Sequence, residues 1–529
     1  QSSMPLDDPE FNAGTYIDSV CRGVYRHLLK RDETEMTLGG RGHKDGKTDL
    51  LWTIQKPEGN WAIRSSAYVL RKALKRMTEQ VTFDKPSFEV ARASIPPNTL
   101  PVLVPSHRSY MDFLVCSFLF FSRPDLGIDI PHIAAANEFS KIPFLGWLFK
   151  QTHAFYLKRG VGREDDTLTQ QVHDLVDRRL TLQFFVEGTR SRSRQFLRPK
   201  RGILRCLQAA DQAYAVLPIS ITYDHLPEEN AFVKELAGGP KSKMALGKLL
   251  LWSIKMVRGA VDIGRIHVAC GEPVLLEADT DVYEVSDRLV AELQRQMATT
   301  THHLSAFLAN HDVEGVELEW LQEAVARRGR QVLESPLLGR EVDAVTEMCM
   351  RYHWMHHFFA EALVAYPNHP AMTYHATRNR LVQPSSAAEF ELDDPRVQRV
   401  IEVLGSKVCA DYTAAVVGLG TPGSSLEGVS PRALVQANRA LHLPNIEEAF
   451  DDMVERGILS KASADGWQWG PQGDALGAYL QACRWPGPVS GGPEVEQAIK
   501  RLQEAEESLH GPDQGAGHRG DGVSRPPSA

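Results

Sequence analysis

The sequence has no apolar run long enough to cross a lipid bilayer. The longest run in its 529 residues spans 113–121 and ends at Ser122-Arg123-Pro124, whereas a transmembrane helix needs about 18 apolar residues. No signal peptide is visible at its start either. We therefore expect no membrane-spanning segment.

Cysteine and positive charge are also scarce. The seven cysteines form no C-x-x-C pair, which favours reduced thiols over a disulfide framework. The net charge is −8, from 59 basic and 67 acidic residues, and it argues against a protein that coats nucleic acid with its whole surface. The absence of G-x-S-x-G excludes the strand-to-helix elbow of a serine hydrolase.

The chain does contain a pattern of alternating strands and helices. Five short apolar segments, separated by helical stretches, predict an α/β fold with a mostly parallel sheet flanked by helices and with helical N- and C-terminal regions; these segments are 100–105, 130–136, 182–186, 216–222 and 266–269. We expect four regions: a helical or irregular region at 1–96, the α/β domain at 97–300, a helical domain with a candidate winged-helix-like end at 301–485, and a mostly disordered tail at 486–529.

Three motifs resemble ligand sites but lack a required part. The Gly-rich stretch 39–48 lacks the first glycine of a phosphate loop, and 418–423 matches G-x-G-x-x-G but contains Pro422 and opens no helix, which a dinucleotide site requires. His353, His356 and His357 have no carboxylate or cysteine at ligand spacing. We expect loops and packed or capping histidines here, and no metal site.

The first candidate catalytic group follows the strand 100–105. His107 lies in the expected turn and Asp112 in the first turn of the next helix, so the carboxylate could orient the imidazole as a general base. The spacing of Ser109 and Asp112 is equally typical of a capping box, in which Asp112 only serves the helix N-terminus. The motif alone leaves both interpretations open.

A second candidate follows the strand 182–186. Glu187 and Gly188 precede Arg190 and Arg192, and arginines at the carboxyl end of a strand suit a phosphate monoester. The alternative is a solvated or RNA-binding patch. Parallel strands would bring His107, Arg190 and Tyr223 to one edge of the sheet, where ligands of α/β folds bind. Residues 141–205 hold fourteen basic and six acidic residues, an excess that favours an anionic ligand.

Four blocks follow one another along the chain, at 107–112, 155–159, 185–193 and 217–224. In these blocks the sequence resembles the glycerol-3-phosphate and dihydroxyacetone-phosphate acyltransferases, within the H-x4-D glycerophospholipid acyltransferase superfamily. Val186 stands where lysophosphatidate acyltransferases usually have proline, so the sequence looks more like the enzymes that acylate position 1, and lysophosphatidate acylation is the alternative. Lys158 stands where the family commonly has arginine.

The resemblance implies transfer of an acyl group from acyl-CoA or acyl-carrier protein to the sn-1 hydroxyl of glycerol-3-phosphate or dihydroxyacetone phosphate, the first step of glycerophospholipid synthesis. It implies no cofactor and no covalent acyl-enzyme. His107 would be the general base, Asp112 its partner, and backbone N–H groups near His107 or Gly188 the oxyanion donors. The expected substrate-binding residues are Lys158, Arg159, Glu187, Gly188, Thr189, Arg190 and Arg192.

Two further expectations concern partners. Residues 241–257 could form a basic amphipathic helix at a membrane surface or an ordinary helix that covers the sheet, and we expect a peripheral protein on the cytosolic face. A winged-helix-like end could bind nucleic acid, but residues 430–485 hold five basic and seven acidic residues, the wrong sign for that partner. No nucleic acid is therefore expected.

Overall fold

The structure is a computed structural model in which most of the chain between residues 61 and 483 can be described. The described residues are 49–50, 61–136, 148, 150–157, 166–210, 212–240, 262–311, 313–351, 354, 358, 370, 393–438, 441–463 and 466–483. Several predictions lie outside them, namely those for Lys158, Arg159, the three histidines 353, 356 and 357, and the stretches 39–48, 241–257 and 486–529.

A mixed, mostly parallel sheet forms the centre of the α/β domain, which confirms the predicted fold class. Its order is β1-β2-β8-β7-β3-β6-β4-β5, with β9 beside β7. Strands β7, β3, β6, β4 and β5 run parallel, whereas β8 and β9 are antiparallel to β7. The strands are β1 (Asp49–Leu50), β2 (Thr78–Phe83), β3 (Leu100–Pro105), β4 (His132–Ala136), β5 (Ala154–Leu157), β6 (Leu182–Gln183), β7 (Tyr214–Tyr223), β8 (Gly264–Cys270) and β9 (Val274–Leu276).

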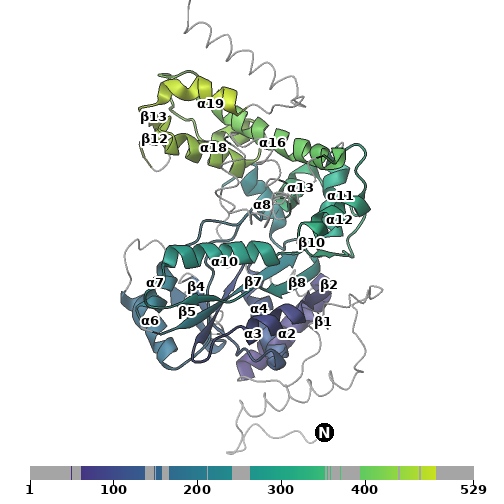
Figure 1. Ribbon diagram of the computed structural model, residues 1–529, viewed down its shortest axis with the longest axis vertical. Helices are drawn as coiled ribbons and strands as arrows, with labels where there is room; N and C mark the ends of the chain where they lie inside the picture. Colours follow the sequence, from purple (N-terminus) through teal and green to yellow (C-terminus); the bar gives the residue numbers. More distant parts are fainter. Residues whose placement is uncertain are drawn as a thin grey trace, which may run out of the picture.

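Helices cover both faces of this sheet (Figure 1). Because side chains alternate along a strand, β3 sends Leu103 into one core and Val102 and Val104 into another. A strand buried on both faces reads as a continuous apolar run, which is why the sequence predicted it. The first core includes α2 (Trp61–Met77), α3 (Lys85–Ala93) and α4 (Met111–Ser122); the second includes α6 (Asp166–Asp177), α7 (Gly202–Gln208) and α10 (Val282–Gln296).

The predicted boundary at residue 97 falls inside the domain rather than at its start. Strand β2 pairs in parallel with β8, and Leu74 of α2 and Phe88 of α3 are buried in the sheet's first core. The sequence conceals this strand because α2 runs directly into it, with no turn residue between Met77 and Thr78.

A separate core organises the C-terminal helices, which lie at the top of Figure 1. Where the sequence suggested a winged-helix-like end, β12 (Leu459–Lys461) pairs antiparallel with β13 (Trp467–Trp469). The remaining elements are β10 (Thr299–Thr300), β11 (Val332–Leu333), α11 (Thr301–Asn310), α12 (Leu318–Arg327), α13 (Ala344–Arg351), α16 (Pro395–Leu419), α17 (Pro431–Ala437), α18 (Leu443–Glu455) and α19 (Leu476–Ala482).

The fold bears on two features that the sequence argued against, a dinucleotide site at 418–423 and a membrane-spanning helix. The stretch 418–423 begins within the last turn of α16, so its glycines end a helix instead of following a strand, as a dinucleotide site requires. Among the helices of the described residues, none is both long and apolar enough to cross a bilayer.

Candidate active site

The carboxyl ends of β3, β6 and β7 meet at one edge of the sheet, and the predicted residues converge there. His107 follows β3, Glu187 follows β6, and Tyr223 ends β7. The backbone N–H of His107 donates to Glu187 Oε1 at 2.9 Å, and the Tyr223 hydroxyl donates to Asp112 Oδ1 at 2.8 Å. Residues more than 75 positions apart in the chain are thus in direct contact.

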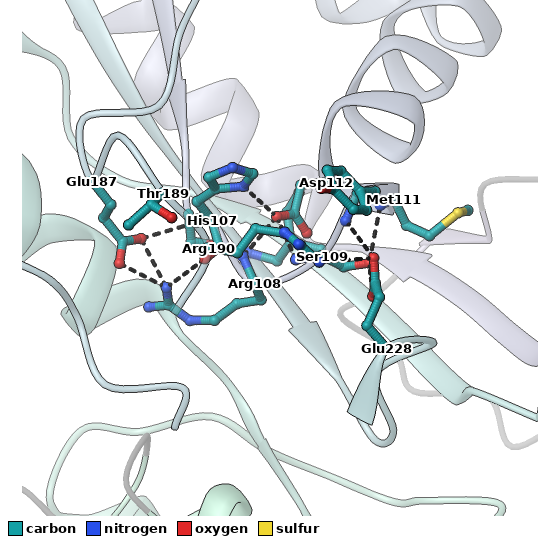
Figure 2. Close-up of polar contacts among 12 residues, drawn as sticks. His107, Arg108, Ser109, Met111, Asp112, Glu187, Thr189, Arg190 and Glu228 are labelled. Carbon is teal, nitrogen blue, oxygen red and sulfur yellow. Dashed lines mark hydrogen bonds and ion pairs between the residues drawn. The ribbon is translucent and has the colours of Figure 1, made fainter. Parts of the chain in front are cut away.

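Asp112 serves both roles that the sequence left open. Its Oδ2 lies 3.1 Å from His107 Nδ1, and it also accepts the N–H groups of Arg108 and Ser109 at 2.7 and 2.8 Å (Figure 2). The capping box is only half formed, because the Ser109 hydroxyl accepts the N–H of Met111 at 3.0 Å. One carboxylate therefore holds the turn and orients the imidazole within it.

The environment of His107 keeps its imidazole neutral. The residue is 8% exposed, and its ring stacks on Phe185 with centroids 3.8 Å apart. Burial lowers the pKa of His107, an effect that the hydrogen bond to Asp112 opposes. With Nδ1 on the carboxylate, Nδ1 carries the proton; within the described part of the chain, Nε2 makes no hydrogen bond. This is the protonation state that a general base needs.

Glu187 is buried, and it connects the turn after β6 with the turn after β3 that carries His107. It is 1% exposed and pairs with Arg108, whose Nη1 lies 2.8 and 2.9 Å from its two oxygens. Glu187 Oε2 also accepts the N–H of Leu197 at 3.0 Å, and Oε1 that of His107. These four contacts occupy the carboxylate, so Glu187 positions Arg108 and His107 in this geometry, and its predicted role in substrate binding stays a prediction.

The turn after Glu187 requires its glycine. Gly188 has φ +66°, and a Cβ there would lie 2.8 Å from Lys200 Cγ. Thr189 is exposed, and its Oγ1 accepts Arg192 Nη1 at 3.2 Å. Arg192 Nε also donates to Glu235 of α8 (Glu229–Leu236) at 3.0 Å. Thr189 and Arg192 therefore form one cluster with α8.

Arg190 lies closest to the His107 turn among the predicted phosphate-binding residues that are described. Its guanidinium carbon lies 3.6 Å from the centroid of the Tyr110 ring, and its Nη1 lies 3.4 Å from Glu228 Oε1. A cavity of about 320 Å³ lies between this loop and the C-terminal helices; His107 and Asp112 do not line it. Its charged lining includes Arg190, Arg192, Arg198, Glu235, Arg432 and Glu447.

The predicted oxyanion donors near His107 and at Gly188 are already engaged. The N–H groups of residues 107 to 112 donate to Glu187, Asp112, Glu228 and Ser109, and that of Gly188 donates to the Phe185 carbonyl at 3.0 Å. These bonds hold the two turns in place, so these groups are not free among the N–H groups predicted near His107 or Gly188. Within the described residues, the N–H groups of Thr189 and Arg190 make no hydrogen bond, which leaves them available as donors.

Sequence reasoning missed two carboxylate contacts that complete the site. Tyr223 was placed at the correct edge without its role as a donor to Asp112, and Glu228 was not singled out at all. Both partners lie more than 110 residues away in the chain. The only local signal for Glu228 was its place in Pro227-Glu228-Glu229, a typical helix start.

Comparison with known proteins places this site in a recognised segment. Residues 88–222 match the model of the Acyltransferase family. Dihydroxyacetone phosphate acyltransferase from Homo sapiens is 34% identical over 227 residues, which are 41% of this chain and 32% of that protein. Glycerol-3-phosphate acyltransferase from Xanthomonas axonopodis pv. citri is 31% identical over 233 residues, 42% of this chain and 25% of that protein.

These matches confirm the resemblance for the segment that carries His107 and Arg190. The chain spans about a third of the length of the curated dihydroxyacetone phosphate acyltransferase and a quarter of that of the glycerol-3-phosphate acyltransferase. Among solved structures, the 1-acyl-sn-glycerophosphate (LPA) acyltransferase PlsC from Thermotoga maritima aligns with 18% sequence identity and a TM-score of 0.30, over 54% of this chain and 89% of that one.

Proposed function

We propose that this protein transfers an acyl group from acyl-CoA or acyl-carrier protein to the sn-1 hydroxyl of glycerol-3-phosphate or dihydroxyacetone phosphate, the first step of glycerophospholipid synthesis. The observation that carries the proposal is the neutral His107 held by Asp112 beside an arginine-bearing turn. A base and an anion-binding group on one sheet edge are what acylation of a phosphorylated alcohol needs.

In the proposed reaction, His107 Nε2 takes the proton of the acceptor hydroxyl as the oxygen attacks the thioester carbonyl. Asp112 stabilises the imidazolium that forms, because its Oδ2 already lies 3.1 Å from Nδ1. Collapse of the tetrahedral intermediate expels the thiolate, which receives the proton from His107. Thr189 and Arg190 N–H groups are the backbone donors proposed for the oxyanion.

The acceptor phosphate is assigned to arginine side chains after β6. Arg190 and Arg192 are both half-buried, so a phosphate there would be weakly screened by solvent. Lys158 and Arg159 follow β5, whose carboxyl end lies at the same sheet edge, and are proposed to complete the set. Glu187, at the start of the same turn, joins it to the His107 turn through its pair with Arg108 and its contact with the His107 N–H.

We further propose that the protein works as a peripheral protein at the cytosolic face of a membrane, because its acyl product is a lipid. Residues 241–257 carry Lys241, Lys248 and Lys255 at seven-residue spacing, which suits an anionic interface. Flotation with anionic liposomes tests this: replacing all three lysines with glutamate should abolish binding, and unchanged flotation would refute the role of this segment.

The acceptor assay tests the proposed function. Purified protein is given labelled acyl-CoA with glycerol-3-phosphate, dihydroxyacetone phosphate or lysophosphatidate in separate reactions. We expect product from one or both of the first two acceptors. Transfer to lysophosphatidate alone would replace the proposal with the alternative activity, and no transfer from acyl-CoA or acyl-carrier protein to any acceptor would reject it.

A further inference from the structure

Glu228 directly precedes helix α8 and lies beside Ser109 and Met111 of the His107 turn (Figure 2). It is 7% exposed. Its Oε2 accepts the Ser109 hydroxyl at 2.8 Å, and its Oε1 accepts the Tyr110 N–H at 2.9 Å. The same Oε1 lies 3.4 Å from Arg190 Nη1. A single buried carboxylate thus contacts both halves of the site.

The carboxylate of Glu228 is not used to cap its own helix. Glu228 occupies the N-cap position of α8, yet its side chain accepts no hydrogen bond from the first turn, which is what an N-cap side chain ordinarily does. A carboxylate this buried needs partners because desolvation is costly. All three partners that the structure gives it belong to the site: Ser109, Tyr110 and Arg190.

The neighbouring ion pairs of α8 lack this bridging geometry. Glu229 pairs with Arg194 at 3.0 Å and with His225, and Glu235 pairs with Arg192 at 3.0 Å. These ion pairs join α8 to Arg194, His225 and Arg192, and not to the turn at 107–112. Arg190 is also the arginine whose guanidinium lies on the Tyr110 ring, at 3.6 Å, and Glu228 accepts the N–H of that same tyrosine.

We propose that Glu228 is a positioning residue that fixes Arg190 against the His107 turn and so sets the affinity for the phosphorylated acceptor, an inference that rests on the proposed function. Arginine has five N–H donors, and Glu228 lies near only Nη1. The other N–H donors of Arg190 can bind a phosphate, while the contact with the Tyr110 ring holds the guanidinium in position. The distance from phosphate to Nε2 of His107 is thereby kept constant.

The test is Glu228→Gln, which keeps the shape and removes the charge. The amide oxygen can still accept the Tyr110 N–H, and the amide nitrogen can donate to the Ser109 hydroxyl. Arg190, however, no longer has a negative charge beside its Nη1. We expect KM for the acceptor, and the Kd for inorganic phosphate measured by calorimetry, to rise about tenfold, the value of one charged hydrogen bond. KM for acyl-CoA should stay within about twofold.

Glu229→Gln is the matched control, because it removes the adjacent carboxylate of α8 and its pairs with Arg194 and His225. It should lower Tm while leaving phosphate affinity at the wild-type value. Glu228→Asp, which keeps the charge, should recover part of the lost phosphate affinity. Glu228→Ala also loses the contacts to Ser109 and Tyr110, so kcat should fall as well.

Unchanged phosphate affinity in folded Glu228→Gln would overturn the inference, and so would a wild-type protein that binds no phosphate. Equal rises in KM for acceptor and acyl-CoA, together with a lower Tm, would also overturn it in favour of a purely structural role. Failure of the proposed function would look different, because the wild-type protein would then transfer no acyl group. Phosphate binding by Glu228→Gln and Glu229→Gln would still decide the role of Glu228.

Discussion

At the scale of single residues, two tyrosines on β7 differ in one contact. Tyr223 and Tyr214 are both buried, 2% and 0% exposed. The Tyr223 hydroxyl donates to Asp112 Oδ1 at 2.8 Å, whereas that of Tyr214 has no hydrogen-bond partner among the described residues. Burial and the neighbouring Asp112 hold the pKa of Tyr223 well above its usual range, so it stays a donor.

Tyr223→Phe should therefore destabilise the protein by about 1–3 kcal/mol, because it leaves a buried carboxylate oxygen unsatisfied. It should also lower kcat, since Asp112 would be less firmly held against His107. Urea unfolding and initial-rate kinetics measure the two effects.

Tyr214→Phe is the control for Tyr223→Phe. It removes a hydroxyl that is buried without a partner, so it should be neutral or slightly stabilising. Equal losses of stability in both variants would show that the Asp112 contact contributes nothing.

At the scale of elements, the turn after β3 and the turn after β6 are joined by a buried ion pair. Arg108 is 2% and Glu187 1% exposed, and the Arg108 guanidinium also lies 4.1 Å from the centroid of the Phe196 ring. Within the described residues, Arg108 Nε and Nη2 have no hydrogen-bond partner. Glu187 is thus the carboxylate that compensates this buried charge.

Glu187→Ala should cost about 3–5 kcal/mol of unfolding free energy, because it leaves Arg108 charged and buried. The exposed pair Arg198–Glu455, at 3.2 Å, provides the contrast: Glu455→Ala should cost about 0–1 kcal/mol. Midpoints of urea unfolding measure both. A loss below about 1 kcal/mol for Glu187→Ala would contradict the role given to this pair.

The sheet was predictable from the sequence where a strand is buried on both faces. Strand β3 and most of β7 were recognised from apolar runs, because no solvent-facing residue interrupts them. Strand β2 was missed since its sequence, Thr-Glu-Gln-Val-Thr-Phe, mixes polar and apolar residues and follows α2 without a break. Local pattern could indicate which residues end a strand, and so it found His107.

The partners of those residues could not be predicted in the same way. Glu228 meets Ser109 only because β7 lies beside β3 and α8 follows β7. Arg190 was expected to face a phosphate, and sequence alone gave no sign that Glu228 lies against it. Contacts between chain segments more than a hundred residues apart depend on strand order, which apolar runs do not encode.

At the scale of the whole molecule, buried neutral histidines link stability to pH. Burial lowers the pKa of His132 and His302 to about 4, and that of His267 to about 3. The Nε2 atoms of His302 and His225 lie 3.0 Å apart. The charge of Arg194 lowers the pKa of His302 further, whereas the charge of Glu229 raises it. Below about pH 6.5 each histidine is mostly protonated in the unfolded chain, but it stays neutral in the folded chain until the pH nears its lowered pKa.

Stability should therefore be fully present above about pH 6.5 and fall progressively between pH 6.5 and 4, because the unfolded state binds more protons in that window. We expect Tm to be several degrees lower at pH 5 than at pH 7.5. His302→Gln should flatten this slope. A Tm that stays constant or rises toward pH 5 would contradict the neutral state of these histidines.

The C-terminal helices complete a cavity with the arginine loop. Helix α18 presents Glu447, Glu448 and Asp451 to the cavity that Arg192 also lines, and Arg432 of α17 donates to the Gly239 carbonyl at 2.7 Å. An acidic helix that faces arginines of the same chain is poorly suited to DNA phosphates. The position of α18 thus supports an accessory role for this domain over a nucleic-acid-binding one.

The central claim is that His107 is the general base of an acyl transfer. The most direct measurement compares wild-type protein and His107→Ala, matched in Tm, for transfer from labelled acyl-CoA to glycerol-3-phosphate and to dihydroxyacetone phosphate. Loss of a general base costs about 10²–10⁴-fold in rate, so we predict at least a hundredfold fall in kcat with little change in phosphate affinity. A folded His107→Ala variant that acylates either acceptor at the wild-type rate would contradict the account.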